Sequence, residues 1–457
     1  SRPWFSSHTL HWSTDLPVDL DENGWVKSLG KDQYARTMML TGNEQPNFHP
    51  AGCFVILYNG EGKIGIFPQK ILGSKPGKLW LYADPSAGAI TLTIEETNPA
   101  NYIRDIRVAY VGTSACEDGG AMDQQAEARL SQKFNPDFVE SIKSFRALRF
   151  MDWMATNNSK VRAVDDRPRV TDAQYTVKGA PVEVMVELAN QIKADPWFTL
   201  PHLADDGYVR WFAEYVRDHL DKDRVAYVEY SNEVWNFIFD QAHYSGGEGN
   251  KLRLSSNSYE AHIRYYSRRS VQIFKVWEDV FGVSDRLVRV MGSQAANSWL
   301  SEVALGFEDA REHTDALAIA PYFCGKVCED VGEAWFLSKT PDQILDEVQA
   351  HSLADPKRWL GEQKAVADRF GVGLIAYEGG QHLVAAGSAQ NNDQVTQLLI
   401  AVNRHPRMKD IYLDYLGLWR AAGGGLFMHF VNTGGSSKWG SWGARETLTQ
   451  PLKDAPK

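Results

Sequence analysis

Seven apolar runs, most of which end in polar or aromatic residues, recur between residues 147 and 432 of this chain. Stretches with apolar residues three and four apart, typical of helices, lie between the runs. Strands that alternate with helices predict parallel strands joined by right-handed crossovers. The predicted strands are 147–153, 197–202, 225–232, 287–294, 316–323, 373–380 and 425–432. The predicted helices include 181–194, 208–220, 263–282, 341–353, 360–371 and 392–405.

Polar groups at the ends of several successive strands favour one architecture over its main alternative. A (β/α)8 barrel carries chemistry at the carboxyl ends of many strands, whereas a doubly wound sheet concentrates it at one switch point. No GxGxxG or GxxxxGK[ST] motif follows any run, which further disfavours nucleotide binding. We therefore predict an α/β fold, a (β/α)8 barrel over residues 114–457. Its first strand then lies within residues 1–40, is irregular, or precedes Ser1.

The stretch before the predicted barrel contains short strand-like segments that are not separated by predicted helices. Strand-like segments separated by Gly, Asn and Pro turns predict an antiparallel β-sandwich over residues 43–113. Residues 1–42 look irregular, and we expect this N-terminal segment to pack on the barrel or belong to it. The five strand-like segments are 53–60, 63–67, 78–84, 89–97 and 103–112.

Composition excludes some partners and suggests another. The net charge of −10 argues against a nucleic-acid partner, and no apolar run approaches the length of a membrane span. The chain has 15 Trp, 18 Tyr and 20 Phe, whose flat faces and polar edges suit sugar rings but equally suit a large core. A polysaccharide or oligosaccharide is the expected partner, and the oligomeric state stays open.

Four cysteines suggest an oxidising compartment. Cys53 and Cys116 bracket the strand-rich stretch, and Cys324 and Cys328 lie four residues apart. An even count with local pairing fits two disulfides in a secreted or periplasmic protein, with four free thiols as the alternative. The spacing without neighbouring histidines makes a poor zinc site, so we expect no metal and no cofactor. No signal peptide is visible, which suggests a mature or trimmed chain.

Two carboxylates stand at the ends of predicted strands. Glu233 ends the run 225–232, and Glu378 lies near the end of the run 373–380. Their separation of 145 residues fits the fourth and seventh strands of a barrel with two loop insertions, at 245–258 and 324–335. Two carboxylates across a cleft suit glycoside hydrolysis, in which one protonates the leaving oxygen and the other attacks the anomeric carbon. The alternatives are a helix-capping role for Glu233 and a turn carboxylate for Glu378.

The strings SNE at 231–233 and YEGG at 377–380 resemble the retaining glycoside hydrolases of clan A. The resemblance implies that Glu233 is the acid/base, Asn232 the partner of the sugar 2-hydroxyl and Glu378 the nucleophile. It further implies that Tyr322 hydrogen-bonds the nucleophile and that Arg149 helps to keep it ionised. The family often places a Trp under the sugar after the eighth strand, where Trp439 or Trp442 could serve. His202, after the third strand, would touch the same sugar.

Four more residues near strand ends are candidates for lining a sugar site, each with a structural alternative. Trp153 and Trp235 follow strand ends and are either sugar platforms or walls of the core. His382 and His429 lie near the expected mouth of the barrel. For Arg149 the alternative is a structural ion pair with Asp152 or another barrel carboxylate. For Tyr322 it is core packing, and for His202 it is a satisfied structural histidine.

The expected function is retaining hydrolysis of a β-linked polysaccharide or oligosaccharide, with an endo-acting β-glucanase (cellulose-like substrate) as the first guess. The barrel could instead be a transglycosidase with the same carboxylates, or a carbohydrate-binding protein without activity. Serine-based hydrolysis lacks support, because no GxSxG motif lies at a strand-to-helix turn.

Overall fold

The computed structural model describes residues 3–8, 11–39, 50–112, 116 and 119–457. These residues fall into two compact units. The first comprises residues 1–136 and 168–181, and the second comprises residues 137–167 and 182–457.

The first unit contains two four-stranded antiparallel sheets around one cluster of buried side chains. Ala35, Leu92 and Ile94 from one sheet share this cluster with Phe54, Ile56 and Leu81 from the other. One sheet has the order β1 (Phe5–His8), β4 (Gln33–Met39), β9 (Ile90–Thr97), β6 (Gly62–Phe67). The second has the order β10 (Arg104–Gly112), β5 (Gly52–Asn59), β8 (Lys78–Ala83), β7 (Ile71–Lys75). A ribbon of β2 (Asp19–Leu20) and β3 (Val26–Ser28) and helix α1 (Gly119–Ser131) complete the unit.

The expectation for residues 1–42 was wrong in part. Among the described residues of this segment, β1 and β4 join the antiparallel sheet beside β9 instead of the barrel. Strand β4 alternates between buried and half-buried side chains, with Ala35 fully buried, so its buried face belongs to the core of this unit. No described residue of 1–40 therefore supplies the missing first barrel strand. Positions 40–49 lie outside the described residues.

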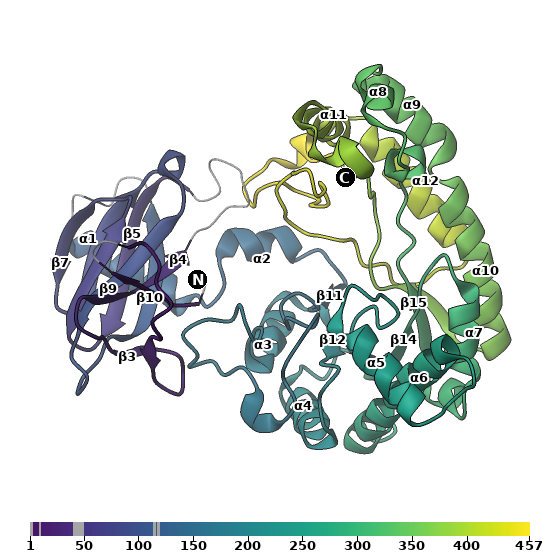
Figure 1. Ribbon diagram of the computed structural model, residues 1–457, viewed down its shortest axis with the longest axis horizontal. Helices are drawn as coiled ribbons and strands as arrows, with labels where there is room; N and C mark the ends of the chain where they lie inside the picture. The colour runs from purple at the N-terminus through teal and green to yellow at the C-terminus, as the bar shows by residue number, and fades with distance from the viewer. Residues whose placement is uncertain (1–2, 9–10, 40–49, 113–115, 117–118) are drawn as a thin grey trace. The chain divides into compact units, whose positions relative to one another are not determined.

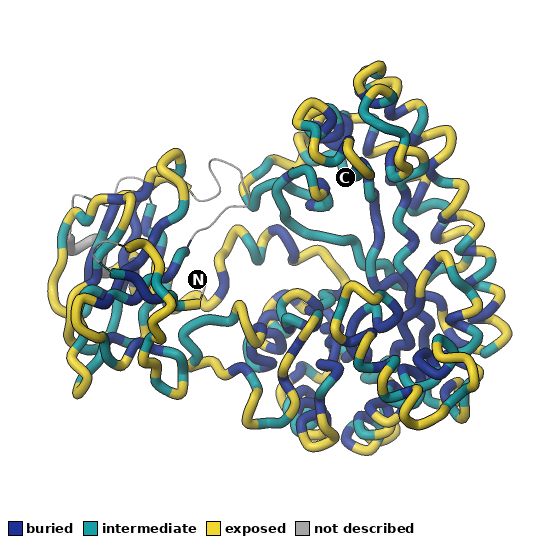
Figure 2. Tube along the Cα trace, viewed as in Figure 1, coloured by how far each residue is buried: buried dark blue, intermediate teal, exposed yellow. Residues whose placement is uncertain are grey.

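The second unit is built on a six-stranded parallel sheet in chain order, a half-barrel. All six side chains of β12 and all four of β15 are buried, as expected for strands that are covered on both faces. Figure 1 shows helices such as α3, α4 and α6 outside the strands, and Figure 2 shows the strands as the buried centre. The strands are β11 (Ala147–Arg149), β12 (Asp195–Leu200), β13 (Ala226–Tyr230), β14 (Leu287–Gly292), β15 (Ala316–Ile319) and β16 (Gly373–Ala376).

Six of the seven predicted barrel strands are present as strands, and the seventh is irregular. Residues 425–430 run beside β16 without forming a regular strand among the described residues. Ala376 and Phe427 form a parallel bridge, and the amide of Met428 donates to Ala376 over 3.1 Å. The expected closed eight-stranded barrel is thus not fully formed within the described chain, which shows six strands and one irregular neighbour.

Helices connect and cover these strands. The longer ones that sequence periodicity predicts are α3 (Val182–Ile192), α4 (Asp206–His219), α6 (Ser258–Phe281), α9 (Pro341–His351), α10 (Ala354–Phe370) and α11 (Asp393–Arg404). The others are α2 (Pro136–Ile142), α5 (Asp240–Lys251), α7 (Ser298–Gly306), α8 (Glu333–Leu337) and α12 (Met408–Ala421). Short 3-10 turns are η1 (Pro85–Ala87), η2 (Val164–Asp166), η3 (Ala310–His313), η4 (Gly325–Cys328), η5 (Gly387–Asn391) and η6 (Leu452–Asp454).

The stretch 245–258, expected to be an inserted loop, is helical as far as Lys251. Glycine lowers helix propensity, but here it permits close packing of α5 on α6. A Cβ at Gly249 would lie 2.3 Å from the carbonyl oxygen of Ala261, so only glycine fits. Tertiary packing therefore overrides the local preference for a loop. None of the described helices has the length and apolar content needed to cross a membrane.

Candidate active site

The carboxyl ends of the parallel strands bring charged and polar side chains together. Arg149 ends β11, Glu233 lies shortly after β13, and Glu378 shortly after β16. In a flat sheet β11 and β16 would lie about 24 Å apart, at about 4.8 Å per strand. The guanidinium of Arg149 nevertheless donates to Glu378 Oε1 over 2.9 Å. The sheet must therefore curve strongly, so that its first and last strands meet at this end.

Arg149 is the centre of the cluster. Its Nη1 donates to Glu378, and its Nε and Nη2 donate to Glu229 Oε2 over 3.1 and 3.0 Å. Nη2 also donates to Asn232 Oδ1 over 2.9 Å. The side chain is only 4% exposed and stacks over the ring of Tyr377 at 4.9 Å from the ring centroid. A buried cation with two carboxylate partners is held in one orientation, because each lost contact would leave a buried charge unpaired.

Glu378 has two strong hydrogen-bond donors. Arg149 contacts Oε1, and the hydroxyl of Tyr322 donates to Oε2 over 3.0 Å. Burial raises the pKa of this carboxyl to about 7, and the nearby charge of Glu233 adds to the rise. Arg149 and the Tyr322 hydroxyl oppose it, because both favour the ionised form. Glu378 is therefore predominantly ionised above about pH 7.

Among the described residues, the hydrogen-bond donors to Glu233 are neutral. The hydroxyl of Tyr377 donates to Oε1 over 3.0 Å, and the side-chain amide of Asn236 donates to Oε2 over 2.9 Å. Glu233 and Ser231 both have left-handed backbone conformations, with φ of 42° and 60°. Non-glycine residues rarely adopt such angles, and they cluster where function constrains the backbone. The strained turn directs the Glu233 side chain back toward the end of β16.

Asn232 is buried beside Glu233, at 3% exposure, and both ends of its amide are engaged. Its Oδ1 accepts from Arg149, and its Nδ2 donates to Asn157 Oδ1 over 3.0 Å. Gln241 donates to the same Asn157 oxygen and to the Asn232 carbonyl. These contacts lock Asn232 next to the two carboxylates.

Sequence reasoning missed Glu229 and Tyr377. Glu229 is 2% exposed, lies within β13, and accepts hydrogen bonds from Arg149 and from Trp197 Nε1, the latter over 2.9 Å. A carboxylate between Val228 and Tyr230 in an apolar run should have signalled a buried cation partner. Tyr377 gave no comparable signal, because a tyrosine at a strand end is common.

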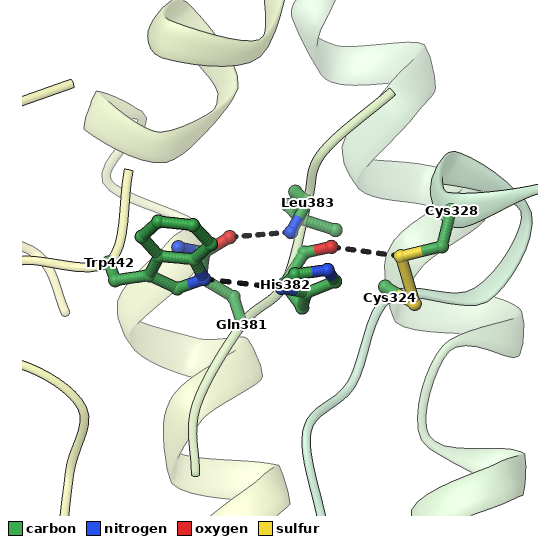
Figure 3. Close-up of a disulfide and its surroundings, with 6 residues drawn as sticks. All are labelled: Cys324, Cys328, Gln381, His382, Leu383 and Trp442. Atoms are coloured by element: carbon green, nitrogen blue, oxygen red, sulfur yellow. Dashed lines mark hydrogen bonds between the residues drawn. A yellow bond between two sulfur atoms is a disulfide. The ribbon is translucent and has the colours of Figure 1, made fainter. Parts of the chain in front are cut away.

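His382 and Trp442 lie against each other (Figure 3). The ring centroid of His382 is also 5.9 Å from that of Tyr322. Their rings stack with centroids 5.7 Å apart, and Trp442 Nε1 donates to His382 Nδ1 over 3.2 Å. Burial lowers the pKa of His382, which favours the neutral ring that accepts this bond. Cys324 and Cys328 form a disulfide, and Cys328 Sγ lies 2.9 Å from the carbonyl oxygen of His382. The disulfide thus supports the backbone that carries this ring pair.

The remaining candidates lie elsewhere or are largely covered. Trp235 is 7% exposed and contacts the rings of Tyr266 and Tyr377, which leaves little of its surface for a ligand. Trp153 stacks on Phe138, and His202 packs edge-on against Tyr244. Burial lowers the pKa of His202 and of His429 to about 4, so both are neutral near pH 7. Trp439 is 56% exposed, and its ring lies beside Lys438.

The cluster offers two carboxylates in different surroundings. One faces a cation and a tyrosine hydroxyl, and the other faces neutral donors. Two carboxylates in such different surroundings can take different roles in one reaction. The described residues contain no group of three or more His, Cys, Asp or Glu side chains that could hold a metal ion.

Comparison with solved structures returns glycoside hydrolases. The family 51 arabinofuranosidase from Xanthomonas axonopodis pv. citri is 13% identical, with 65% of this chain and 61% of that chain covered and a TM-score of 0.34. An endo-β-1,4-mannanase double mutant from Cellulomonas fimi is 12% identical over 54% and 51%, with a TM-score of 0.31. The β-glycosidase from Thermosphaera aggregans is 10% identical over 67% and 78%, with a TM-score of 0.35.

This chain therefore spans about three fifths of that arabinofuranosidase and half of that mannanase. No family model and no curated sequence matches it.

Proposed function

We propose that this chain is a retaining glycoside hydrolase that cleaves a β-linked polysaccharide or oligosaccharide. The observation that carries the proposal is the contrast between the partners of the two carboxylates. Arg149 and Tyr322 contact Glu378, whereas Tyr377 and Asn236 contact Glu233. Arg149 and the Tyr322 hydroxyl favour the ionised form of Glu378, whereas the two hydrogen-bond donors to Glu233 carry no charge.

In the first step the Glu378 carboxylate attacks the anomeric carbon, and the bond to the leaving oxygen breaks. Glu233 gives its proton to that oxygen, and the sugar becomes covalently bound to Glu378. In the second step Glu233 takes a proton from water, which attacks the same carbon and releases Glu378. In an enzyme that retains the configuration at the anomeric carbon, the two carboxyl groups lie about 5–5.5 Å apart. Asn232 is assigned to the sugar 2-hydroxyl, and the His382–Trp442 pair to another contact with the sugar chain.

The proposal extends to the fold and to the location of the protein. The curved sheet is proposed to be the core of a (β/α)8 barrel, and the two antiparallel sheets a β-sandwich. The disulfides Cys53–Cys116 and Cys324–Cys328 support a secreted or periplasmic location, because such bonds persist in oxidising compartments. We propose endo action on a β-glucan as the first substrate to test.

The decisive experiment is a panel of soluble β-glucan, xylan, mannan and galactan with product sizing. Wild type is assayed beside Glu233→Gln and Glu378→Gln, with and without an acceptor sugar. Release of new reducing ends by wild type but not by the variants supports hydrolysis. Transfer to the acceptor in place of hydrolysis would identify a transglycosidase, and binding without turnover would identify a carbohydrate-binding protein.

A further inference from the structure

Three large apolar side chains are exposed on the segments that follow β13 and β14, and two of them share a ring neighbour. Phe237 is 50% exposed, Ile238 77% and Trp299 41%. Tyr259 lies between the two exposed rings, with its centroid 6.4 Å from Phe237 and 5.7 Å from Trp299. Isolated exposed hydrophobic residues need no explanation, but connected ones often mark a binding surface. We call Phe237, Ile238, Tyr259 and Trp299 the rim surface.

The topology places the rim surface on the face that carries the carboxylates. Phe237 and Ile238 follow β13 by a few residues, as Glu233 does. Tyr259 is in the first turn of α6, which leads back to β14, and Trp299 is in the first turn of α7, which follows β14. In an alternating strand–helix fold, helices start on the side where the strands end. The rim surface and Glu233 therefore lie on the same side of the sheet.

Hydrogen bonds and ring contacts fasten the rim surface to the segment that carries Glu233. His262 Nε2 lies 2.8 Å from the carbonyl oxygen of Val234, the residue after Glu233. The ring of His262 packs edge-on against both Phe237 and Tyr259, at 5.2 and 5.8 Å. Asn236 bonds Glu233 directly. The rings are thus held at a fixed position relative to the carboxylate.

The proposed role of Glu233 indicates which part of the substrate would lie on the rim surface. An acid that protonates the leaving oxygen faces the departing part of the substrate, so that part lies on the Glu233 side of the cleaved bond. Phe237 and Trp299 are half-exposed aromatic side chains, and aromatic faces stack on the apolar face of a sugar ring. We propose that the rim surface binds the sugar rings on the leaving-group side of the cleaved bond. This inference rests on the proposed function.

The test uses Phe237→Ala, Trp299→Ala and the double variant, with Leu413→Ala as a matched control. Leu413 is 54% exposed on α12. Each protein is assayed on a hexasaccharide and on a 4-nitrophenyl β-glycoside of the same sugar, in which no sugar follows the cleaved bond. The hexasaccharide is the one that wild type cleaves fastest among cellohexaose, laminarihexaose, xylohexaose and mannohexaose.

We expect each single variant to lower kcat/KM on the hexasaccharide about tenfold and to change it less than about twofold on the nitrophenyl substrate. The control should match wild type on both. Equal losses on both substrates, or no loss on the hexasaccharide, would overturn the rim assignment while leaving the hydrolase proposal intact.

If wild type cleaves none of the four, calorimetric binding of the same sugars separates the outcomes. Weaker binding by the ring variants alone then supports sugar binding at the rim surface but contradicts hydrolysis of these sugars and with it the leaving-group assignment. Absence of binding by wild type contradicts both. Sedimentation that shows a wild-type dimer and a monomeric Phe237→Ala, with unchanged kinetics, would assign the surface to a second copy of the chain.

Discussion

The hydroxyl of Tyr377 donates a 3.0 Å hydrogen bond to Glu233. Tyr377 and Glu378 are consecutive residues after β16, so one of them binds the first carboxylate of the candidate pair and the other is the second carboxylate. Tyr377 holds Glu233, and its neighbour Glu378 is held by Arg149. In a flat sheet β13 and β16 would be about 14 Å apart, so this contact depends on the curvature of the sheet. The relative position of the two carboxylates is therefore set by the backbone of one strand end.

Replacement of the nucleophile should abolish turnover and keep substrate binding. We expect Glu378→Gln to lower kcat at least about 1,000-fold with little change in the dissociation constant, because only the reacting oxygen is lost. Glu378→Gly with azide should yield the glycosyl azide of inverted configuration, since azide then attacks from the vacated side. NMR of the product measures this. An azide product of retained configuration would contradict the assignment.

The rate loss on replacing Glu233, the proposed acid, should depend on the leaving group of the substrate. We expect Glu233→Gln to lower kcat on unmodified oligosaccharides by about 100- to 10,000-fold, the range of general acid catalysis. On a 2,4-dinitrophenyl glycoside, whose leaving group needs no proton, the first step should be nearly normal and should appear as a burst of dinitrophenolate. A loss of equal size in that burst phase would argue that Glu233 has another role.

The pH dependence should show an acidic limb near pH 7. Burial raises the pKa of Glu378 to about 7, and the nucleophile must be ionised, so kcat/KM should rise as pH increases through that value. Tyr322→Phe removes a hydrogen bond that lowers the pKa of Glu378, so the limb should move to higher pH. Profiles of kcat/KM for both proteins measure the shift. An unmoved limb in Tyr322→Phe would mean that another group controls it.

Glu229 should act through Arg149. Its negative charge offsets part of the Arg149 charge that favours ionisation of Glu378, so Glu229→Gln should move the acidic limb to lower pH. The lost buried pair should also destabilise the fold by about 3 kcal/mol. Asp195→Asn is the matched control, because Asp195 is a buried carboxylate paired with Arg146 at the start of β12. It should destabilise without moving the pH profile, and a shift of equal size in both variants would refute a specific role.

The two disulfides should differ in their effect on stability. Cys53 and Cys116 are 63 residues apart, whereas Cys324 and Cys328 are four apart. Each disulfide restricts the unfolded chain and so raises the free energy of unfolding. The expected increase is about 4 kcal/mol for the long loop and about 2 kcal/mol for the short one. Paired Cys→Ser variants measured by denaturant unfolding, with each unit followed separately, check this order. The short disulfide should affect KM more, because it supports His382.

Much of the strand order and of the candidate site followed from the sequence, for a physical reason. Strands such as β12 and β15 are buried on both faces, so their apolar runs are continuous and easily recognised. Polar residues directly after them, such as Asn232 and Glu233, interrupt that pattern.

Contacts between distant segments could not be read in the same way. The burial of Glu229 depends on Arg149, 80 residues away, and the helical course of the Gly-rich stretch in α5 depends on its packing on Ala261. The early strand β4 was missed because its partner β9 lies more than 50 residues further along the chain, and β1 was missed because it pairs with β4.

Arg149 and Glu378 are 229 residues apart in the chain, yet they share one ion pair. A fragment that ends between Glu233 and β16 contains the arginine and the proposed acid but lacks the proposed nucleophile. Two complementary fragments divided in that interval should show the proposed turnover only after β16 docks beside β15. The proposed activity would thus report directly whether β16 has been added to the sheet.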